Sequence, residues 1–210
     1  MGKARIFLKE LHSLLPPKIA TILDFELGNY RSFWRIFSDK KNLSQKIKSG
    51  LAFNYGEMQN GMLWMVQFLS VSEIVAIELL VSNEKLRIFL LILGILTILL
   101  ILGFWASFKT NPHDIDDEYL NIRQGSLYQI KIPKFQISEI NGVVSREHSK
   151  CQLIDGILHL PVMNETNAQV KLLSPIYQSL PWGIKGAIKE INFYINDAKS
   201  SVPKLIQVTR

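Results

Sequence analysis

A run of 21 residues without a charged side chain, Ile88 to Phe108, most constrains what this chain can fold into. A helix rises about 1.5 Å per residue, so this run would span roughly 30 Å, the hydrocarbon thickness of a bilayer. A stretch of about 10–14 apolar residues would instead be typical of a buried helix in a soluble domain. The run therefore predicts a membrane-spanning helix.

A second apolar stretch, Gly61 to Ser82, precedes the first and contains 22 residues, among them Gln67, Glu73 and Glu78. The short polar link Asn83-Glu84-Lys85 follows it, and asparagine suits a helix end or a turn. Two bilayer-length runs joined in this way predict a helical hairpin over 61–108. Its two helices would carry an aromatic belt at the same end, formed by Trp64 and Trp105.

The basic residues flank this hairpin. The net charge is +6, with ten Lys and Arg residues in 1–60, twelve in 109–210 and two between. Cytoplasmic flanks of membrane proteins carry such an excess of positive charge. We therefore predict a multi-pass protein of the cell membrane with both termini cytoplasmic, in contact with the lipid bilayer and not with nucleic acid. The single cysteine, Cys151, rules out an intramolecular disulfide and agrees with a reducing compartment.

Residues 1–60 predict an amphipathic helical region on the cytoplasmic side. Pro16 and Pro17 precede a helical pattern, and proline suits a first helical turn. The helix would either lie on the membrane surface or pack on another domain. Basic residues would favour an anionic leaflet, namely Arg31, Arg35, Lys40, Lys41, Lys46 and Lys48. The apolar positions recur at steps of three and four: Ile19, Ile22, Leu23, Leu27, Tyr30, Phe33, Trp34 and Phe37.

Residues 109–210 change to a strand pattern and predict a separate cytoplasmic domain. Glu118–Arg123 and Ser126–Ile132 flank a Gln-Gly turn, which indicates a hairpin. A closing helix over Ala198–Val208 would be short or kinked at Pro203. The predicted class is α+β, with a small antiparallel sheet or barrel ending in this helix. Further strands are expected at Ile157–Val162, Gln169–Leu173 and Ala187–Ile195.

The order of these elements resembles membrane-anchored bacterial PH-like domains, in which a last membrane helix runs into a conserved strand pair. The residues that carry this resemblance are Leu120–Gly125 (LNIRQG) and Ile132–Ile137 (IPKFQI). The upstream half is similar to a group of uncharacterised bacterial two-span membrane proteins, through Phe53-Asn54-Tyr55 and Glu73. Many of those relatives carry a histidine five positions after the glutamate, where this chain has Glu78. The resemblance implies a PH-like roll that binds a protein or a lipid.

Glu73 and Glu78 are the candidate intramembrane polar residues. A carboxylate within the hydrocarbon costs several kcal/mol unless it is neutralised, paired or hydrated. One interpretation is ion or proton handling, or contact with a partner helix. The other is that Glu73 is protonated and hydrogen-bonded to Ser72, Thr97 or an oligomer neighbour, while Glu78 extends outward. Two small residues of the strong span, Gly94 and Gly103, would allow close helix approach.

The remaining polar clusters do not predict a catalytic, cofactor or metal site. His148, Cys151 and His159 match no zinc-ligand spacing, so we interpret them as loop histidines and a buried thiol. The acidic run Asp114–Glu118 lacks the glycine and distant glutamate of a calcium loop. The sequence also contains no phosphate-binding loop, nucleophile elbow or dinucleotide fingerprint.

Two functional hypotheses follow. The first is a non-enzymatic integral membrane protein, in which a PH-like domain acts as a membrane-anchored binding or scaffold module for a protein partner or a second copy of the chain. The alternative is an oligomeric small transporter or channel subunit that uses Glu73. Because two spans cannot enclose a pathway, the alternative requires several copies.

Overall fold

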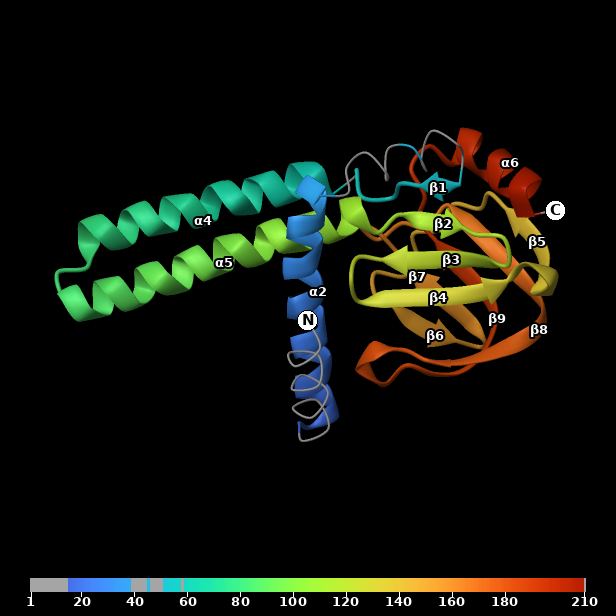
Figure 1. Cartoon of the computed structure of the whole chain (residues 1–210), viewed down its shortest axis with the longest axis horizontal. Helices are drawn as coiled ribbons and strands as arrows, with labels where there is room; N and C mark the ends of the chain where they lie inside the picture. Colours follow the sequence, from blue (N-terminus) through green and yellow to red (C-terminus); the bar gives the residue numbers. More distant parts are fainter. Residues whose placement is uncertain (1–14, 39–44, 46–50, 58, 210) are drawn as a thin grey trace.

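The computed structural model describes residues 15–38, 45, 51–57 and 59–209, and it has the predicted α+β class. Two long helices form an extended hairpin at one end of the molecule (Figure 1). A further helix, α2 (Pro17–Ser38), crosses the base of that hairpin, and the strands gather beyond it into a β-domain. Predictions for Lys40, Lys41, Lys46 and Lys48 lie outside the described residues.

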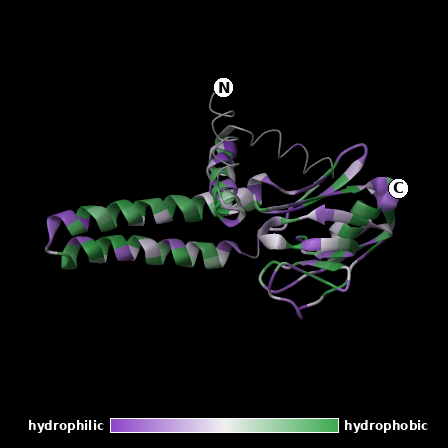
Figure 2. Cartoon of the chain, turned by 90° about the horizontal axis from the view of Figure 1, so that it is seen from below, coloured by the Kyte–Doolittle hydropathy of each residue, from purple (hydrophilic) through white to green (hydrophobic). Residues whose placement is uncertain are grey.

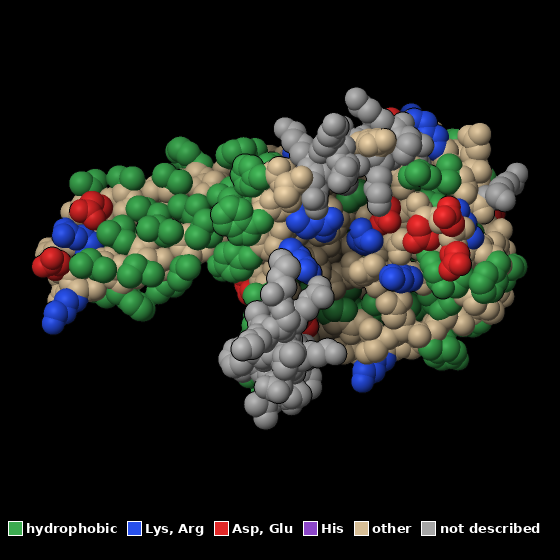
Figure 3. Space-filling model, viewed as in Figure 1, with side chains coloured by type: hydrophobic (Ala, Val, Ile, Leu, Met, Phe, Trp, Pro, Cys, Tyr) green, Lys and Arg blue, Asp and Glu red, His purple; other side chains and the backbone are tan. Residues whose placement is uncertain are grey.

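The hairpin consists of α4 (Asn60–Leu80) and α5 (Glu84–Thr110), close to the predicted spans. Asn83 caps α5, since its side-chain oxygen accepts a hydrogen bond from the Leu86 N–H at 3.1 Å. In the part of the chain that the structure describes, these are the two helices long and apolar enough to cross a membrane. Their ribbons are predominantly apolar, and their apolar side chains project outward (Figures 2 and 3).

Small residues of α5 provide the close approaches of the helical half. A Cβ on Gly94 would lie 2.9 Å from Cγ1 of Ile74 on α4, and a Cβ on Gly103 would lie 3.1 Å from the backbone of Asn29 on α2. The predicted role of these glycines in close helix approach is therefore met within this chain.

Helix α2 packs on α5 mainly through polar residues and Phe25, not through the apolar positions predicted from its periodicity. Asn29 and Ser32 are buried at this contact, and the ring of Phe25 meets that of Phe104 at a centroid distance of 6.0 Å. Trp34 and Phe37 are 68% and 70% exposed. None of the eight apolar positions predicted from the periodicity is buried: five of them are exposed and three are half-buried. The amphipathic helix is present, but much of its apolar side is left uncovered by the described chain.

The β-domain contains two sheets. The first has the order β1-β2-β3-β4 and is antiparallel throughout, and the second has the order β5-β8-β9-β7-β6. The strands of the first sheet are β1 (Ala52–Phe53), β2 (His113–Ile115), β3 (Tyr119–Gln124) and β4 (Tyr128–Pro133). Those of the second are β5 (Ile137–Asn141), β6 (Gln152–Ile154), β7 (Ile157–Leu160), β8 (Ala168–Ser179) and β9 (Lys185–Phe193).

One apolar core joins the two sheets to the closing helix α6 (Ala198–Thr209). Alternation along β3 and β4 places Ile122 opposite Ile130, and both are fully buried. Helix α6 buries Val202 and Leu205 in the same core. Burying a side chain of this size stabilises a fold by about 1.5–3 kcal/mol. The predicted closing helix is confirmed, and it continues through Pro203.

The structure differs from the sequence interpretation in two places. Residues 52–53 form strand β1 of the β-domain, although the sequence interpretation assigned all of 1–60 to the helical region. A two-residue strand has no periodicity to detect, and its partner β2 lies about 60 residues further along the chain. Strand β7 pairs with β9 in parallel, so β9 separates β7 from β8 and the sheet is not purely antiparallel.

Candidate functional site

The helical half and the β-domain meet at a buried junction around Tyr55. Its side chain is fully buried, and its hydroxyl donates to the Asn111 carbonyl at 2.9 Å and accepts from the Gly125 N–H at 2.7 Å. Burial raises the pKa of the Tyr55 phenol well above its usual value. The ring packs edge-on against Phe108, which is the third residue from the C-terminal end of α5. Tyr55 thus ties the end of α5 to the β3–β4 turn.

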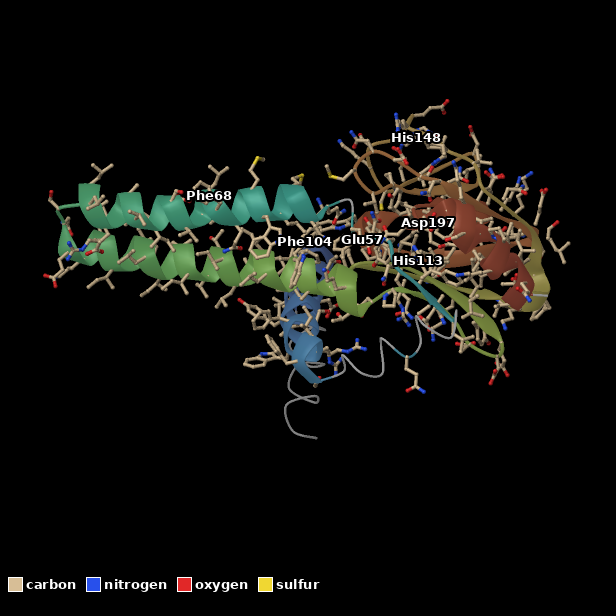
Figure 4. All side chains as sticks on the ribbon, turned by 90° about the horizontal axis from the view of Figure 1, so that it is seen from above. Glu57, Phe68, Phe104, His113, His148 and Asp197 are labelled. Atoms are coloured by element: carbon tan, nitrogen blue, oxygen red, sulfur yellow. The ribbon has the colours of Figure 1, made fainter. Side chains whose placement is uncertain are left out.

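His113, labelled in Figure 4, begins β2 and is separated from the end of α5 by two residues. Its ring stacks on that of Tyr55 with a centroid distance of 4.3 Å. Its Nδ1 accepts from the Arg123 backbone N–H at 3.0 Å, so its Nε2 carries the proton and donates to the Tyr194 carbonyl at 2.8 Å. Both ring nitrogens are therefore used by a neutral imidazole. Burial, reinforced by the nearby charge of Arg123, lowers the pKa of His113 to about 4.

Helix α2 is tied to the same junction. The Ser126 hydroxyl donates to Oδ1 of Asn29 at 2.8 Å, and Nη1 of Arg35 donates to Oδ1 of Asn111 at 3.2 Å. Nδ2 of Asn111 donates in turn to the Ser32 hydroxyl at 3.2 Å. Asn111 therefore links α5 to α2, while Tyr55 and His113 link α5 to the domain. This arrangement is suited to holding the parts in fixed orientation, because its polar groups are engaged with one another.

The two candidate carboxylates, Glu73 and Glu78, are not brought together. Glu73 is exposed midway along α4 and has no hydrogen-bond or ion-pair partner among the described residues. The hydroxyls of Ser72 and Thr97, considered as its partners, donate instead to carbonyls one turn earlier in their own helices. Glu78 lies near the hairpin turn, where its Oε1 is 3.8 Å from Nη1 of Arg87.

The histidines and the cysteine near β6 do not form a metal centre. The ring centroids of His148 and His159 lie 4.0 Å apart. Figure 4 shows His148 at the periphery of the β-domain, away from His113. The Cys151 thiol donates to Oε1 of Gln124 at 2.7 Å, and burial raises its pKa to about 12. Within the described residues, no group of three or more His, Cys, Asp and Glu side chains could hold a metal ion.

The acidic run before β3 has a local structural role. Oδ1 of Asp114 lies 2.9 Å from Nη1 of Arg123 on the neighbouring strand. The carboxylate of Asp116 accepts from the backbone N–H groups of Glu118 and Tyr119 at 3.0 and 2.6 Å, which closes the turn between β2 and β3. The first part of the run is therefore strand β2 of the sheet, and Asp116 closes the turn that follows it, so the run is not a solvated linker.

The structure also contains a cleft that sequence reasoning missed, between the outer edge of β4 and the distal half of β8. Its volume is about 360 Å³. Among the described strands, β4 pairs only with β3, while β5 pairs with β8 only as far as Leu172. Two open strand edges therefore face each other, bridged by a hydrogen bond from Nε2 of Gln178 to the Gln129 carbonyl at 2.8 Å. We call this feature the edge cleft; its lining residues are Gln129, Lys131, Ile176, Tyr177 and Gln178.

No alternation pattern reveals that two edges distant in the sequence face each other. The one local signal was the outward position of Lys131 between two buried isoleucines of β4, which is typical of an edge strand.

In comparisons with known proteins, no family model, no curated protein and no solved structure matches the chain.

Proposed function

We propose that this chain is an integral membrane protein that holds a non-enzymatic binding domain at the cytoplasmic face of the cell membrane. The observation that carries the proposal is the hairpin α4–α5, in which both helices are long and apolar while their apolar surface is exposed. Water would be a poor solvent for such a surface, and lipid a good one. Helix α2 and the β-domain both lie at the base of the hairpin, which is consistent with both flanks in the cytoplasm.

Topology tests this part of the proposal. Reporter fusions at residue 1 and at residue 210 should both be cytoplasmic, and a reporter in the Asn83–Lys85 turn should be external. An external C-terminus would contradict the proposal.

The edge cleft is the proposed binding surface, and its ligand is an extended polypeptide segment. An open strand edge presents unpaired backbone N–H and C=O groups, and an added strand satisfies them. In this cleft a single extended segment would meet an edge on each side. The exposed ammonium of Lys131 favours an acidic segment, and the ring of Tyr177, 82% exposed, offers an apolar contact. A PH-like domain that binds a protein through a sheet edge would act in this way.

Photo-crosslinking in cells tests the binding surface. A benzophenone amino acid at Tyr177 should capture a discrete partner, whereas the same probe at Phe135, which is exposed but outside the cleft, should not. Gln129→Pro should abolish the capture at Tyr177. The N–H and the C=O of one residue in an antiparallel strand point to the same side, and the Gln129 carbonyl points to the cleft. The Gln129 N–H therefore points to the cleft as well, so a proline at this position removes no hydrogen bond between β3 and β4. Equal capture at Tyr177 and Phe135 would contradict the proposed surface.

Glu73 supports a second candidate, the oligomeric transporter or channel subunit. An exposed carboxylate without a partner, midway along an apolar helix, favours contact with another membrane helix. Glu73→Gln keeps the shape and removes the charge. Loss of oligomers in detergent together with an altered ion-flux phenotype would favour the transporter. If Glu73→Gln is expressed normally and neither its oligomers in detergent nor its ion-flux phenotype changes, the transporter hypothesis is contradicted.

A further inference from the structure

The hairpin between β8 and β9 ends in an exposed tryptophan. The tip is the short 3₁₀ turn Pro181–Gly183, and Trp182 at its centre is 52% exposed. Its φ of 61° lies in the left-handed region, which is strained for a residue that carries a side chain. Leu180 is buried in the core beside it, and its N–H donates to the Ile184 carbonyl at 2.9 Å. The turn is thus fixed at its base while it presents a large aromatic ring to the outside.

The tip lies beside α2, although the two segments are about 150 residues apart in the chain. The turn contacts α2 directly, and the β8–β9 hairpin reaches toward α2 in the ribbon view (Figure 1). Helix α2 itself crosses α5 at Gly103 and Phe104. The next residue of α5 is Trp105, whose Nε1 donates to Oδ1 of Asn60 at the start of α4 at 3.0 Å. Helix α2 and Trp105 therefore lie at one level along the hairpin, and the tip lies next to that level, on the β-domain side of α2 (Figure 1).

That level carries aromatic rings beside basic groups. Trp64 and Trp105 line the same shallow gap between α4 and α5, as predicted for an aromatic belt, and Nζ of Lys109 lies 4.8 Å from the Trp105 ring centre. Lys185 is exposed just after the tip, and Lys18 is exposed in the first turn of α2. Tryptophan concentrates at membrane–water interfaces, and nearby lysines are attracted to anionic headgroups.

We propose that Trp182 inserts into the headgroup region of the leaflet that α2 lies on, so that the β8–β9 tip is a second lipid contact of the β-domain. The inference rests on the proposed function, because the hairpin determines where the bilayer lies. The ligand is the interface of a bilayer that contains anionic phospholipid, with Trp182 as the inserted side chain and Lys185 at its edge. This contact explains why a bulky aromatic residue, and not glycine, occupies a strained and solvent-exposed turn.

Depth measurements on the full-length protein test this proposal. In a Cys151→Ser background, an environment-sensitive fluorophore is placed singly at Trp182→Cys, at Val75→Cys and at Phe135→Cys, and each protein is reconstituted in vesicles of phosphatidylethanolamine and phosphatidylglycerol. Val75 is exposed midway along α4, and Phe135 is exposed on the turn after β4. We expect nitroxide on the lipid headgroup to quench the label at 182, nitroxide deep in the acyl chain to quench the label at 75, and neither to quench the label at 135.

Two failures are distinguishable. Quenching at 75 without quenching at 182 would overturn the inference and leave the membrane hairpin intact, whereas no quenching at 75 would overturn the proposed function as well. Because a label could disturb the tip, the intrinsic fluorescence gives a second measurement. The emission lost on going from the parent to Trp182→Phe is the contribution of Trp182, and it should be smaller in vesicles with brominated lipids than in vesicles without bromine. A contribution that is equal in both kinds of vesicle would overturn the inference.

Discussion

Helices α2 and α6 are both amphipathic, yet they use their apolar sides in opposite ways. Helix α6 buries Val202 and Leu205 in the β-domain core. Helix α2 buries Asn29 and Ser32 against α5 and leaves Trp34 and Phe37 exposed. The same type of pattern therefore occurs in two environments. The apolar side of α6 is covered by protein, and that of α2 is exposed and, in the proposed membrane arrangement, available to lipid. A periodic pattern predicts that an apolar side exists but does not say what covers it.

The largest expected effect on stability comes from the apolar side of α6, which the two sheets cover. Leu205→Ala should lower the free energy of unfolding of the β-domain by about 2–5 kcal/mol, because it leaves a cavity between α6 and the sheets. Denaturant unfolding in detergent, followed by near-ultraviolet circular dichroism, measures this loss. The matched variant Leu27→Ala on α2, where the side chain is exposed, should change it by less than about 0.5 kcal/mol. Equal losses would mean that α2 is packed as α6 is.

A comparable effect should follow acidification, through His113 at the junction that joins α2 to the domain. The pKa of His113 is lowered to about 4 in the folded protein, so the unfolded chain binds a proton first as the pH falls. Stability is therefore fully present above the ordinary histidine pKa and is lost as the pH falls from about 6.5 to about 4, by on the order of 3 kcal/mol.

Urea unfolding between pH 7.5 and 4.5 measures this loss, and His113→Gln should flatten the profile. The comparison variant is His159→Gln, because burial also lowers the pKa of His159. A profile unchanged in His113→Gln would show that the junction histidine is not the titrating group.

A smaller effect should follow a change at the contact between α2 and α5. A side chain at Gly103 would meet the backbone of Asn29 at 3.1 Å, so Gly103→Leu should displace α2 at a cost of about 1–3 kcal/mol. Faster tryptic cleavage at Arg31 and Arg35 would report the displacement. The control is Gly61→Leu, because a Cβ at Gly61 has no neighbour within 4 Å. Unchanged cleavage in Gly103→Leu would contradict the packing of α2 described above.

The smallest effect on stability should come from the exposed side of α2. The double variant Trp34→Ser with Phe37→Ser should change the free energy of unfolding in detergent by no more than about 0.5 kcal/mol. In lipid nanodiscs, however, amide exchange along α2 should become faster in the variant than in the parent, because the apolar anchor is lost. Equal exchange in both proteins would show that lipid does not cover this side.

Local features of the sequence predicted the parts of the fold that depend on length and charge. The uncharged run Ile88–Phe108 and the cap at Asn83 sufficed for the hairpin, and alternation sufficed for β3 and β4. The parts that were missed depend on contacts between distant residues. Strand β1 exists because β2 lies beside it, and the edge cleft exists because β8 runs past β5 toward β4. Glu73 was located correctly on its helix, but its exposed position without a partner could not be read from spacing.

The absence of a flexible linker between α5 and β2 has a mechanical consequence. Only Asn111 and Pro112 separate the helix from the strand, and Asn111 is itself bonded to α2 and Tyr55. The β-domain therefore cannot rotate independently of α5. In the proposed membrane arrangement, a tilt of α5 that matches a thinner or thicker bilayer would rotate the β-domain by the same angle, and the orientation of the edge cleft relative to the membrane would change with it.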